Sequence, residues 1–361
     1  MMLRSLALQI KRLLFWLVDF TAVIHFLLNG RKPKPGLTIL CYHRVAEGLP
    51  SNPPFNPFNV SPGHLERQLA ALQALRGTTV VSARHVAEWL RTNRIPEGSF
   101  LLLTFDDGYQ NALVAAEQLA AKGWTGVFFV VTSYVGKPVL DFNDYDRWCQ
   151  NLPHSKPIWY RPVELKDCHR LIALGMEVQP HSHTHRPLGW LESEEMEQEI
   201  QASRAFIEKT LGQLAVAFSY PVGSPYLNHF TPATERAMAK AGFQFAVSTE
   251  AGVNDLHSLP HQAFRMRRIP VNDYNDGLFF LAKAAGYCGI LPIAKYLLHK
   301  LVLPLAHSRA AGSVLGPGTT SNPDAKENGV PRSNGPMAPR AVLARRPRIR
   351  PQPPGAGAKT L

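Results

Sequence analysis

Short apolar runs rich in β-branched residues alternate with helical patterns along most of this chain, and this alternation limits its fold more than any other feature. We expect strands near residues 37–42, 78–81, 100–105, 126–131, 176–178, 215–220, 243–248 and 264–271. We expect helices near residues 64–75, 83–93, 112–122, 162–174, 193–211 and 232–241. Such an order is typical of an α/β protein with a parallel sheet or barrel. The 361 residues have room for two modules or for one large barrel.

Two adjacent carboxylates follow the most apolar of these strands. The run Phe100–Phe105 is hydrophobic almost throughout, so we expect it to be buried on both faces, and it leads directly into Asp106, Asp107 and Gly108. The carboxyl ends of parallel strands are where α/β folds place their chemistry. By itself, however, an Asp-Asp-Gly sequence commonly marks a turn.

Three histidines lie close together at the end of another predicted strand. His181, His183 and His185 fall within five residues, just after the run at 176–178. Neutral imidazoles and a carboxylate are ligands of catalytic zinc and similar ions, which use three protein ligands and leave one position open for water. Asp107, His181 and His185 can supply such a set, which leaves Asp106 to accept a proton from the water. Loop histidines without a metal are the alternative.

The sequence Thr104-Phe-Asp-Asp-Gly108 together with His181-Ser-His-Thr-His185 resembles the polysaccharide deacetylases, the carbohydrate esterases with NodB homology. The resemblance covers about residues 37–271 and implies a distorted (β/α) barrel. It also implies that Asp106 is the catalytic base, that Asp107, His181 and His185 bind the metal, and that His183 is a bystander. Gln179 and Pro180 stand where the family usually has small residues.

A third stretch, Phe218-Ser-Tyr-Pro-Val-Gly223, is similar to the family motif whose backbone helps to hold the oxyanion. The resemblance therefore implies that Tyr220 and Val222 line the substrate site. The arginine that usually belongs to this motif, and that steadies the base, is absent. Arg265 and Arg268 are candidates to replace it, and Arg268 is the residue we assign to the site.

The motif that usually supplies the general acid late in the chain is not apparent, whereas Leu40-Cys-Tyr-His-Arg-Val45 lies near its start. This arrangement resembles the permuted branch of the family, which acts on poly-N-acetylglucosamine. It implies that His43 protonates the leaving amine. A histidine with a purely structural role is the alternative for His43.

The resemblance implies a hydrolase that removes N-acetyl groups from an amino-sugar-containing glycan, either a polysaccharide or a lipid-linked sugar. Zinc is the expected metal, and cobalt, nickel or manganese would also suit an Asp-His-His set. A carbohydrate O-acetyl esterase and a glycan-binding pseudoenzyme are the alternatives. Aromatic residues of the loop before residue 162 are candidates to stack on sugar rings: Phe142, Tyr145, Trp148, Trp159 and Tyr160.

Residues 1–35 contain an apolar run at 13–28 with basic residues on both flanks. The run is interrupted by Asp19 and His25 and is shorter than the roughly 20 residues that span a bilayer. We therefore expect a helix that lies on a membrane surface, with a signal anchor or an ordinary packing helix as alternatives. This expectation places the protein at a bacterial inner membrane or cell envelope. The oligomeric state does not follow from the sequence.

The net charge of +12 is concentrated at the other end of the chain. Residues 308–361 hold nine Lys or Arg residues against two acidic ones, a net +7, together with nine prolines and no aromatic residue. We interpret them as a disordered tail, which leaves +5 for the rest of the chain, and no nucleic-acid partner is expected. The expected organisation is thus an anchor helix at 1–35, a deacetylase domain at 36–282, an apolar terminal helix at 283–307, and the tail. The four cysteines are too widely spaced for a cysteine-bound zinc.

Overall fold

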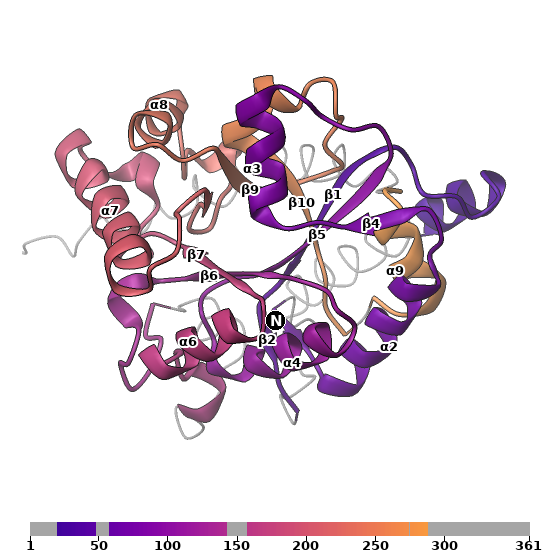
Figure 1. The fold of residues 1–361 in the computed structure, drawn as a ribbon, viewed down its shortest axis with the longest axis horizontal. Helices are drawn as coiled ribbons and strands as arrows, with labels where there is room; N and C mark the ends of the chain where they lie inside the picture. The colour runs from indigo at the N-terminus through magenta and orange to yellow at the C-terminus, as the bar shows by residue number, and fades with distance from the viewer. Residues whose placement is uncertain (1–19, 48–57, 143–156, 274, 288–361) are drawn as a thin grey trace, which may run out of the picture. The chain divides into compact units, whose positions relative to one another are not determined.

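Eight strands form one parallel sheet, in the order β7-β6-β5-β1-β10-β9-β8, with β4 also paired to β5 (Figure 1). The strands are β1 Gly36–Tyr42, β4 Thr78–Val80, β5 Ser99–Phe105, β6 Val127–Val130, β7 Glu177–Pro180, β8 Ala217–Ser219, β9 Phe245–Ala251 and β10 Met266–Pro270. The helices outside the sheet are α2 Pro62–Ala74, α3 Ala83–Thr92, α4 Leu113–Ala121, α6 Leu165–Ala173, α7 Ser193–Ala205, α8 Pro232–Lys240 and α9 Gly277–Ala284. The predicted distorted (β/α) barrel is confirmed.

The computed structural model describes residues 20–47, 58–142, 157–273 and 275–287. The chain divides into two compact units, Met1–Ala310 and Ala311–Leu361, and every described residue belongs to the first unit. The predicted tail at 308–361, residues 288–307 of the predicted terminal helix and residues 1–19 of the predicted anchor lie outside the described residues. Residues 20–28 are helical.

Helix starts in this chain follow from side-chain capping. The hydroxyls of Ser61, Ser82 and Thr231 each accept a hydrogen bond from the backbone N–H three residues further on, at the beginning of α2, α3 and α8. Pro62 and Pro232 occupy the first turns, where the missing N–H costs nothing because it has no partner inside the helix. These caps fix where each helix leaves the strand before it.

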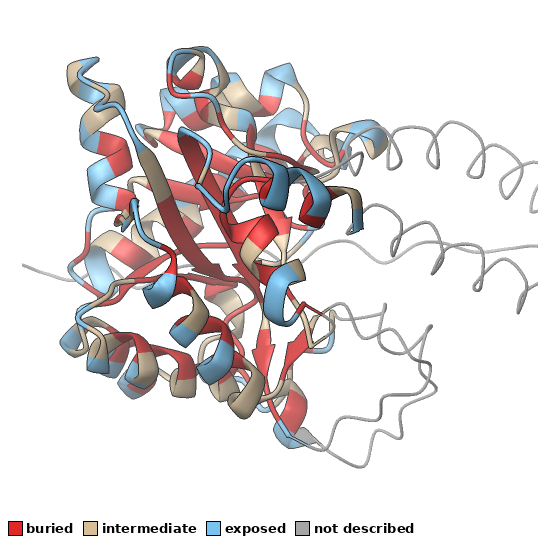
Figure 2. Ribbon diagram, turned by 90° about the vertical axis from the view of Figure 1, so that its right-hand side faces the viewer, coloured by how far each residue is buried: buried red, intermediate tan, exposed pale blue. Residues whose placement is uncertain are grey.

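Strands β1, β5 and β6 are buried on both faces over most of their length, as their apolar runs predicted (Figure 2). Successive side chains of a strand point to opposite faces. Leu101 and Leu103 of β5 therefore join the core under the helices, while Leu102 joins a second core on the other face. Side chains from six strands build this second core, which lies inside the barrel: Leu37, Ile39, Leu102, Val127, Phe129, Ala217, Phe245, Val247 and Met266. The same alternation puts Thr104 and Asp106 on the inner face.

Side chains rather than a backbone ladder join β7 to β8, where the barrel is nearly closed. The amide of Gln179 donates to the carbonyl of Leu214 at 2.8 Å and accepts from the N–H groups of Val216 and Ala217 at 2.9 and 3.0 Å. The amide oxygen of Gln213 accepts from the N–H of Val178 at 2.8 Å. We call these contacts the seam. They give Gln179 a role that a small residue at this position could not fill.

Three parts of the fold differ from expectation. The short pair β2 Arg44–Val45 and β3 Asn59–Val60 was not predicted, because two-residue strands have no detectable period. The helix predicted at 193–211 ends at Ala205 and continues as a π-helical turn, Phe206–Thr210. Helix α9 crosses the predicted boundary between residues 282 and 283.

We predict that Gln179→Leu destabilises the protein by about 3 kcal/mol, because it leaves three backbone polar groups of the seam without a partner at similar side-chain volume. Urea unfolding followed by circular dichroism measures the change. The matched control is Gln201→Leu on the exposed face of α7, which should change the stability by no more than about 0.5 kcal/mol. Equal stability of the two variants would contradict the role assigned to the seam.

Candidate active site

Asp107, His181 and His185 come together at the carboxyl ends of β5 and β7. The Oδ1 atom of Asp107 lies 3.3 Å from Nε2 of His181 and 3.4 Å from Nε2 of His185. Ligand bonds of about 2.0–2.2 Å put neighbouring ligand atoms of a tetrahedral zinc site about 3.3–3.6 Å apart. The spacing of the three groups therefore fits one divalent ion. The three carry one carboxylate and two imidazoles, the donor set of a catalytic site.

A second contact orients the ring of His181. Its Nδ1 lies 2.7 Å from the carbonyl oxygen of Ser219, an acceptor, so Nδ1 carries the proton and Nε2 turns its lone pair toward Asp107. Burial raises the pKa of the Asp107 carboxyl, but hydrogen bonds from His181 and His185 outweigh burial and hold this pKa well below its usual value. Asp107 is thus an anion at every physiological pH.

His185 is held from two sides. Its backbone N–H donates to Oγ of Ser182 at 2.9 Å, and the ring of Phe142 stacks on its imidazole with centroids 3.9 Å apart. Burial lowers the pKa of His185, although Asp107 acts against this. A neutral imidazole is the form that binds a metal.

Glu199 of α7 anchors the histidine loop from behind. Its buried carboxylate accepts from the N–H groups of His183 and Thr184 at 2.9 and 2.8 Å, and from the hydroxyl of Thr184. The ring of His183 turns away to Oγ1 of Thr132 at 2.9 Å. His183 therefore takes no part in the ligand set that the neighbouring histidines form.

Arg268 of β10 forms a buried ion pair with Asp106. Nη1 donates to Oδ1 at 2.7 Å, Nη2 lies 2.7 Å from Oδ2 in an ion-pair contact, and the hydroxyl of Ser219 donates to Oδ2 at 3.1 Å. Burial raises the pKa of Asp106, but the charge of Arg268, followed by that of His181, overcomes burial and lowers this pKa to about 2. Arg265 is instead exposed and pairs with Glu235 at 2.5 Å. Of the two candidate arginines, only Arg268 contacts the carboxylate of Asp106.

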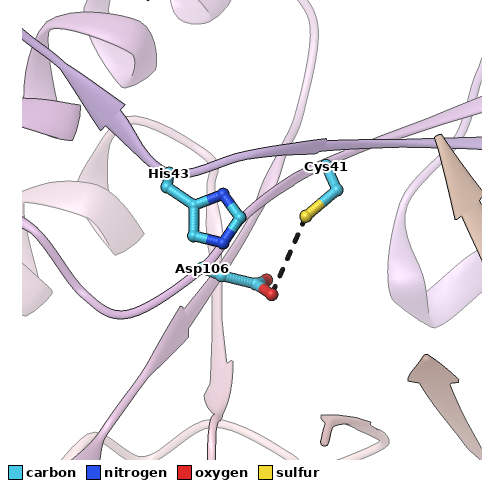
Figure 3. Close-up of side chains that lie close together, drawn as sticks. All are labelled: Cys41, His43 and Asp106. Carbon is cyan, nitrogen blue, oxygen red and sulfur yellow. Dashed lines mark hydrogen bonds between the residues drawn. The ribbon is translucent and has the colours of Figure 1, made fainter. Parts of the chain in front are cut away.

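Cys41 and His43 reach the same place from β1 (Figure 3). The parallel pairing of β1 with β5 aligns Tyr42 with Phe105, and the N–H of Asp106 donates to the carbonyl of Tyr42 at 2.9 Å. His43 therefore lies beside Asp106. The thiol of Cys41 donates to Oδ2 of Asp106 at 3.8 Å.

Cys41, His43 and Asp106 are a second possible ligand group among the described residues, but their chemistry argues against a metal there. Burial raises the pKa of the Cys41 thiol far above neutrality, so it stays protonated, and only the thiolate binds metal. The carboxylate of Asp106 is already neutralised by Arg268. The Asp107 set is accordingly the metal site that the geometry favours.

His43 is half-buried, and its ring packs edge-on against Phe58 with centroids 4.7 Å apart. Its Nδ1 is buried and has no hydrogen-bond partner among the described residues. Burial lowers the pKa of His43, while Asp107 and Asp106 act in the opposite direction. Burial therefore favours the neutral imidazole at this position more than in a free histidine.

The loop after β8 supplies a backbone group rather than a side chain. Val222 has a φ of 59°, rare for a β-branched residue, and no hydrogen bond among the described residues uses its N–H. Tyr220 is fully buried, stacks on Phe230 and donates its hydroxyl to the carbonyl of Phe264 at 3.0 Å. Its side chain thus packs the barrel wall and does not face substrate.

The predicted loop aromatics are dispersed. Phe142 lies against His185, Trp159 is buried, and Tyr160 packs on the guanidinium of Arg44 at 5.1 Å. Tyr145 and Trp148 lie outside the described residues.

Ser219 and Glu199 support the site and were not singled out from the sequence, whereas Phe142 was a candidate for sugar stacking and not for a contact with His185. Glu199 carried a detectable signal, because it falls on the apolar stripe of α7 with Met196, Ile200 and Ser203, where a charge needs a buried partner. Ser219 and Phe142 act by orientation, which no sequence pattern reveals.

Several known proteins are similar to this chain in sequence or in fold. Residues 93–246 match the sequence model of the family described as polysaccharide deacetylase. YxkH of Bacillus subtilis (strain 168), assigned as a polysaccharide deacetylase, is 22% identical over 235 residues, 65% of this chain and 72% of YxkH. The structure is similar to the deacetylase PplD of Streptococcus pyogenes in complex with acetate (TM-score 0.55, 20% identity, 70% of this chain and 99% of that chain). It is also similar to IcaB from Ammonifex degensii, with a TM-score of 0.53 and 21% identity, over 70% of this chain and 98% of that chain.

A nearly closed parallel barrel with a carboxylate and two histidines at its strand ends defines a hydrolase with a possible metal site. The family match and the curated relative confirm the resemblance that the motifs predicted. These findings support an enzyme of the polysaccharide deacetylase type, with a domain of the NodB type over the matched part of the chain.

We predict that Asp107→Asn and His185→Gln each lower the affinity for zinc at least about 100-fold, because each removes one of three protein ligands. Competition with a chromogenic chelator measures the affinity, and metal analysis gives the stoichiometry. His183→Gln is the matched control and should bind zinc like the unaltered protein. Loss of zinc in the control, or its retention in Asp107→Asn, would show that another ligand set binds the ion.

Proposed function

We propose that this enzyme hydrolyses N-acetyl groups of an amino-sugar-containing glycan, either a polysaccharide or a lipid-linked sugar, with the help of a divalent metal. The observation that carries the proposal is the carboxylate of Asp106, kept ionised by Arg268 beside the set formed by Asp107, His181 and His185. One acid can act on a water while the other holds the ion. The resemblance of the chain start to the permuted branch favours the N-acetyl group.

The three ligands fit zinc, and cobalt, nickel or manganese suit the same donors. A bound ion would polarise the acetamide carbonyl and lower the pKa of the attacking water. Asp106 removes the proton from that water. Its pKa of about 2 keeps it ionised but makes it a weak base, so it works only on a water that is already acidified.

The other groups act as the carbon–nitrogen bond breaks. The N–H of Val222, whose backbone has a positive φ and which no hydrogen bond among the described residues uses, donates to the oxygen that becomes negative. His43, beside Asp106 at the end of β1, gives a proton to the leaving nitrogen, so that acetate and a free amine result.

Two alternatives use the same residues. An O-acetyl esterase would need no strong acid for its alcohol leaving group, so His43 would be dispensable. A glycan-binding pseudoenzyme would bind the oligomer without releasing acetate.

We predict that the full-length protein releases acetate from N-acetylglucosamine pentamer, that a chelator abolishes the release and that zinc restores it. Asp106→Asn should lower kcat at least about 1,000-fold, since it removes the base without changing the shape of the side chain. Coupled enzymatic detection of acetate measures the rate, and Asp255→Asn in an exposed loop is the control. Acetylated xylan as the only productive substrate would favour the esterase, and binding without release would favour the pseudoenzyme.

We predict that Arg268→Gln moves the acidic limb of the pH profile to higher pH. Asp106 has a depressed pKa, so its active anion is present above that pKa and is lost as the pH falls through it. Without Arg268, burial dominates and raises the pKa, so the base is protonated at a higher pH than in the unaltered enzyme. Arg268→Lys should give an intermediate profile and exposed Arg265→Gln an unchanged one. An unchanged acidic limb in Arg268→Gln would contradict the role of Arg268 in lowering the pKa of Asp106.

We further propose that the N-terminal segment lies on a membrane surface. In helix 20–28, Ala22, Val23 and Phe26 pack against the body. The opposite side leaves large apolar side chains exposed: Phe20, Ile24, Leu27 and Leu28. Three basic residues follow within six positions of Leu28 (Arg31, Lys32 and Lys34), which suits anionic lipid headgroups. No helix among the described residues is both long and apolar enough to cross a bilayer.

We predict that the full-length protein floats with phosphatidylglycerol vesicles and that the double variant Ile24→Asp, Leu28→Asp binds them at least about 10-fold more weakly. The two charges oppose burial in lipid but leave the packed face of the helix intact. The control is Ile158→Asp, at an exposed apolar residue elsewhere on the body. Flotation of the double variant at the unaltered level would refute this location.

A further inference from the structure

Trp190 is a large apolar side chain that the fold holds at the surface. It is 64% exposed, whereas Leu188 in the same short helix, η4 Leu188–Trp190, is fully buried and anchors that helix. Tryptophan side chains are highly buried on average, so an indole with this exposed fraction is unusual. Its exposure therefore calls for a physical explanation.

The indole does not swing freely. Its Nε1 donates to the carbonyl of Leu227 at 3.0 Å, and the ring of His229 packs edge-on against it with centroids 5.0 Å apart. His229 is itself buried, and its Nδ1 accepts from the N–H of Ser224 at 3.1 Å. One edge of the indole is thus fixed by protein contacts while the ring keeps a large exposed area.

The loop contact that positions Trp190 depends on a glycine. Gly189 donates its N–H to the carbonyl of His229 at 2.9 Å, and a Cβ atom at this position would lie 2.2 Å from the carbonyl oxygen of Asn228. Backbones approach this closely only where a side chain is missing. The two loops are therefore locked together directly under the indole.

Both loops lead away from the catalytic residues. Trp190 follows the metal ligand His185 by five residues, which limits the separation of their Cα atoms to about 18 Å. Leu227 follows Val222, whose N–H we assign to the oxyanion, by five residues as well. Tyr226, the neighbour of Leu227, is also 42% exposed. The exposed aromatic surface is continuous along the chain with two parts of the site.

We infer that Trp190, together with Tyr226 on the loop to which it is bonded, is a sugar-binding subsite that stacks on a pyranose ring of the glycan other than the one being deacetylated. This inference rests on the proposed function and names how its polymeric substrate is held. The axial C–H groups of a pyranose form an apolar face that matches an indole, while its hydroxyls remain in water. An aromatic platform with one hydrogen-bonded edge and one open face suits such a ring.

The subsite is tested with full-length, zinc-loaded protein and N-acetylglucosamine monomer and pentamer. Trp190→Ala is expected to lower the pentamer-to-monomer ratio of kcat/KM about 10-fold, mainly through KM, and to weaken pentamer binding in calorimetry by a similar factor. Trp190→Phe keeps a ring and should recover part of the loss. Leu214→Ala is the matched control, because Leu214 is 66% exposed but precedes β8, at the opposite end of the strand from the site.

The outcomes separate the subsite from the proposed function. Acetate release with an unchanged pentamer-to-monomer ratio in Trp190→Ala would overturn the subsite alone. Pentamer binding that depends on Trp190 without acetate release would support the subsite and overturn the catalytic proposal. A protein that neither binds nor deacetylates the pentamer would overturn both.

Discussion

The barrel is nearly closed by side chains, and the neighbouring contacts orient His181, a candidate metal ligand. Along the seam, Gln179 bonds to the backbone leading into β8, and two residues later His181 bonds to the carbonyl of Ser219 at the end of β8. Ser219 in turn donates its hydroxyl to Asp106. Closure of the fold, orientation of the imidazole and support of the base therefore share one row of hydrogen bonds.

Backbone strain is concentrated around the same row. Seven residues other than glycine have positive φ among the described residues, and four of them belong to the site: Asp107, Ser182, His185 and Val222. Asp106 points into the barrel by the ordinary alternation of a strand, and the left-handed turn at Asp107 brings the next carboxylate to the same side. Strain of this kind persists only when packing over-determines it. Here the packing comes from Glu199, Phe142 and the seam.

Much of the fold and part of the site could be predicted from the sequence. The strands could be located because parallel strands that are buried on both faces are nearly continuous apolar runs in the sequence. Asp106, Asp107, His181 and His185 were detectable because each group is contiguous and follows a strand directly. The sequence left both Arg265 and Arg268 as candidates, because it does not show that Arg265 ends the helical turn before β10 while Arg268 lies inside that strand.

Other parts depend on contacts between distant residues and left no local trace. Gln179 looked like an irregularity beside the first histidine, and only the position of Leu214 and Ala217 shows why a long amide is needed there. The side chain of Tyr220 was assigned to the substrate site because it belongs to a motif, yet its hydroxyl is used by Phe264. A sequence motif thus identifies the segment that forms a site more reliably than it identifies the role of each side chain in that segment.

The residues of the candidate active site are attached at strand ends, whereas Trp190 and Tyr226 stand on loops that follow those strands. An exchange of Trp190 or Tyr226 would leave Asp106 and Arg268 in place, because the sheet and the seam fix them independently. The scaffold thus separates the residues that set the geometry of the site from the surface that its loops present to solvent.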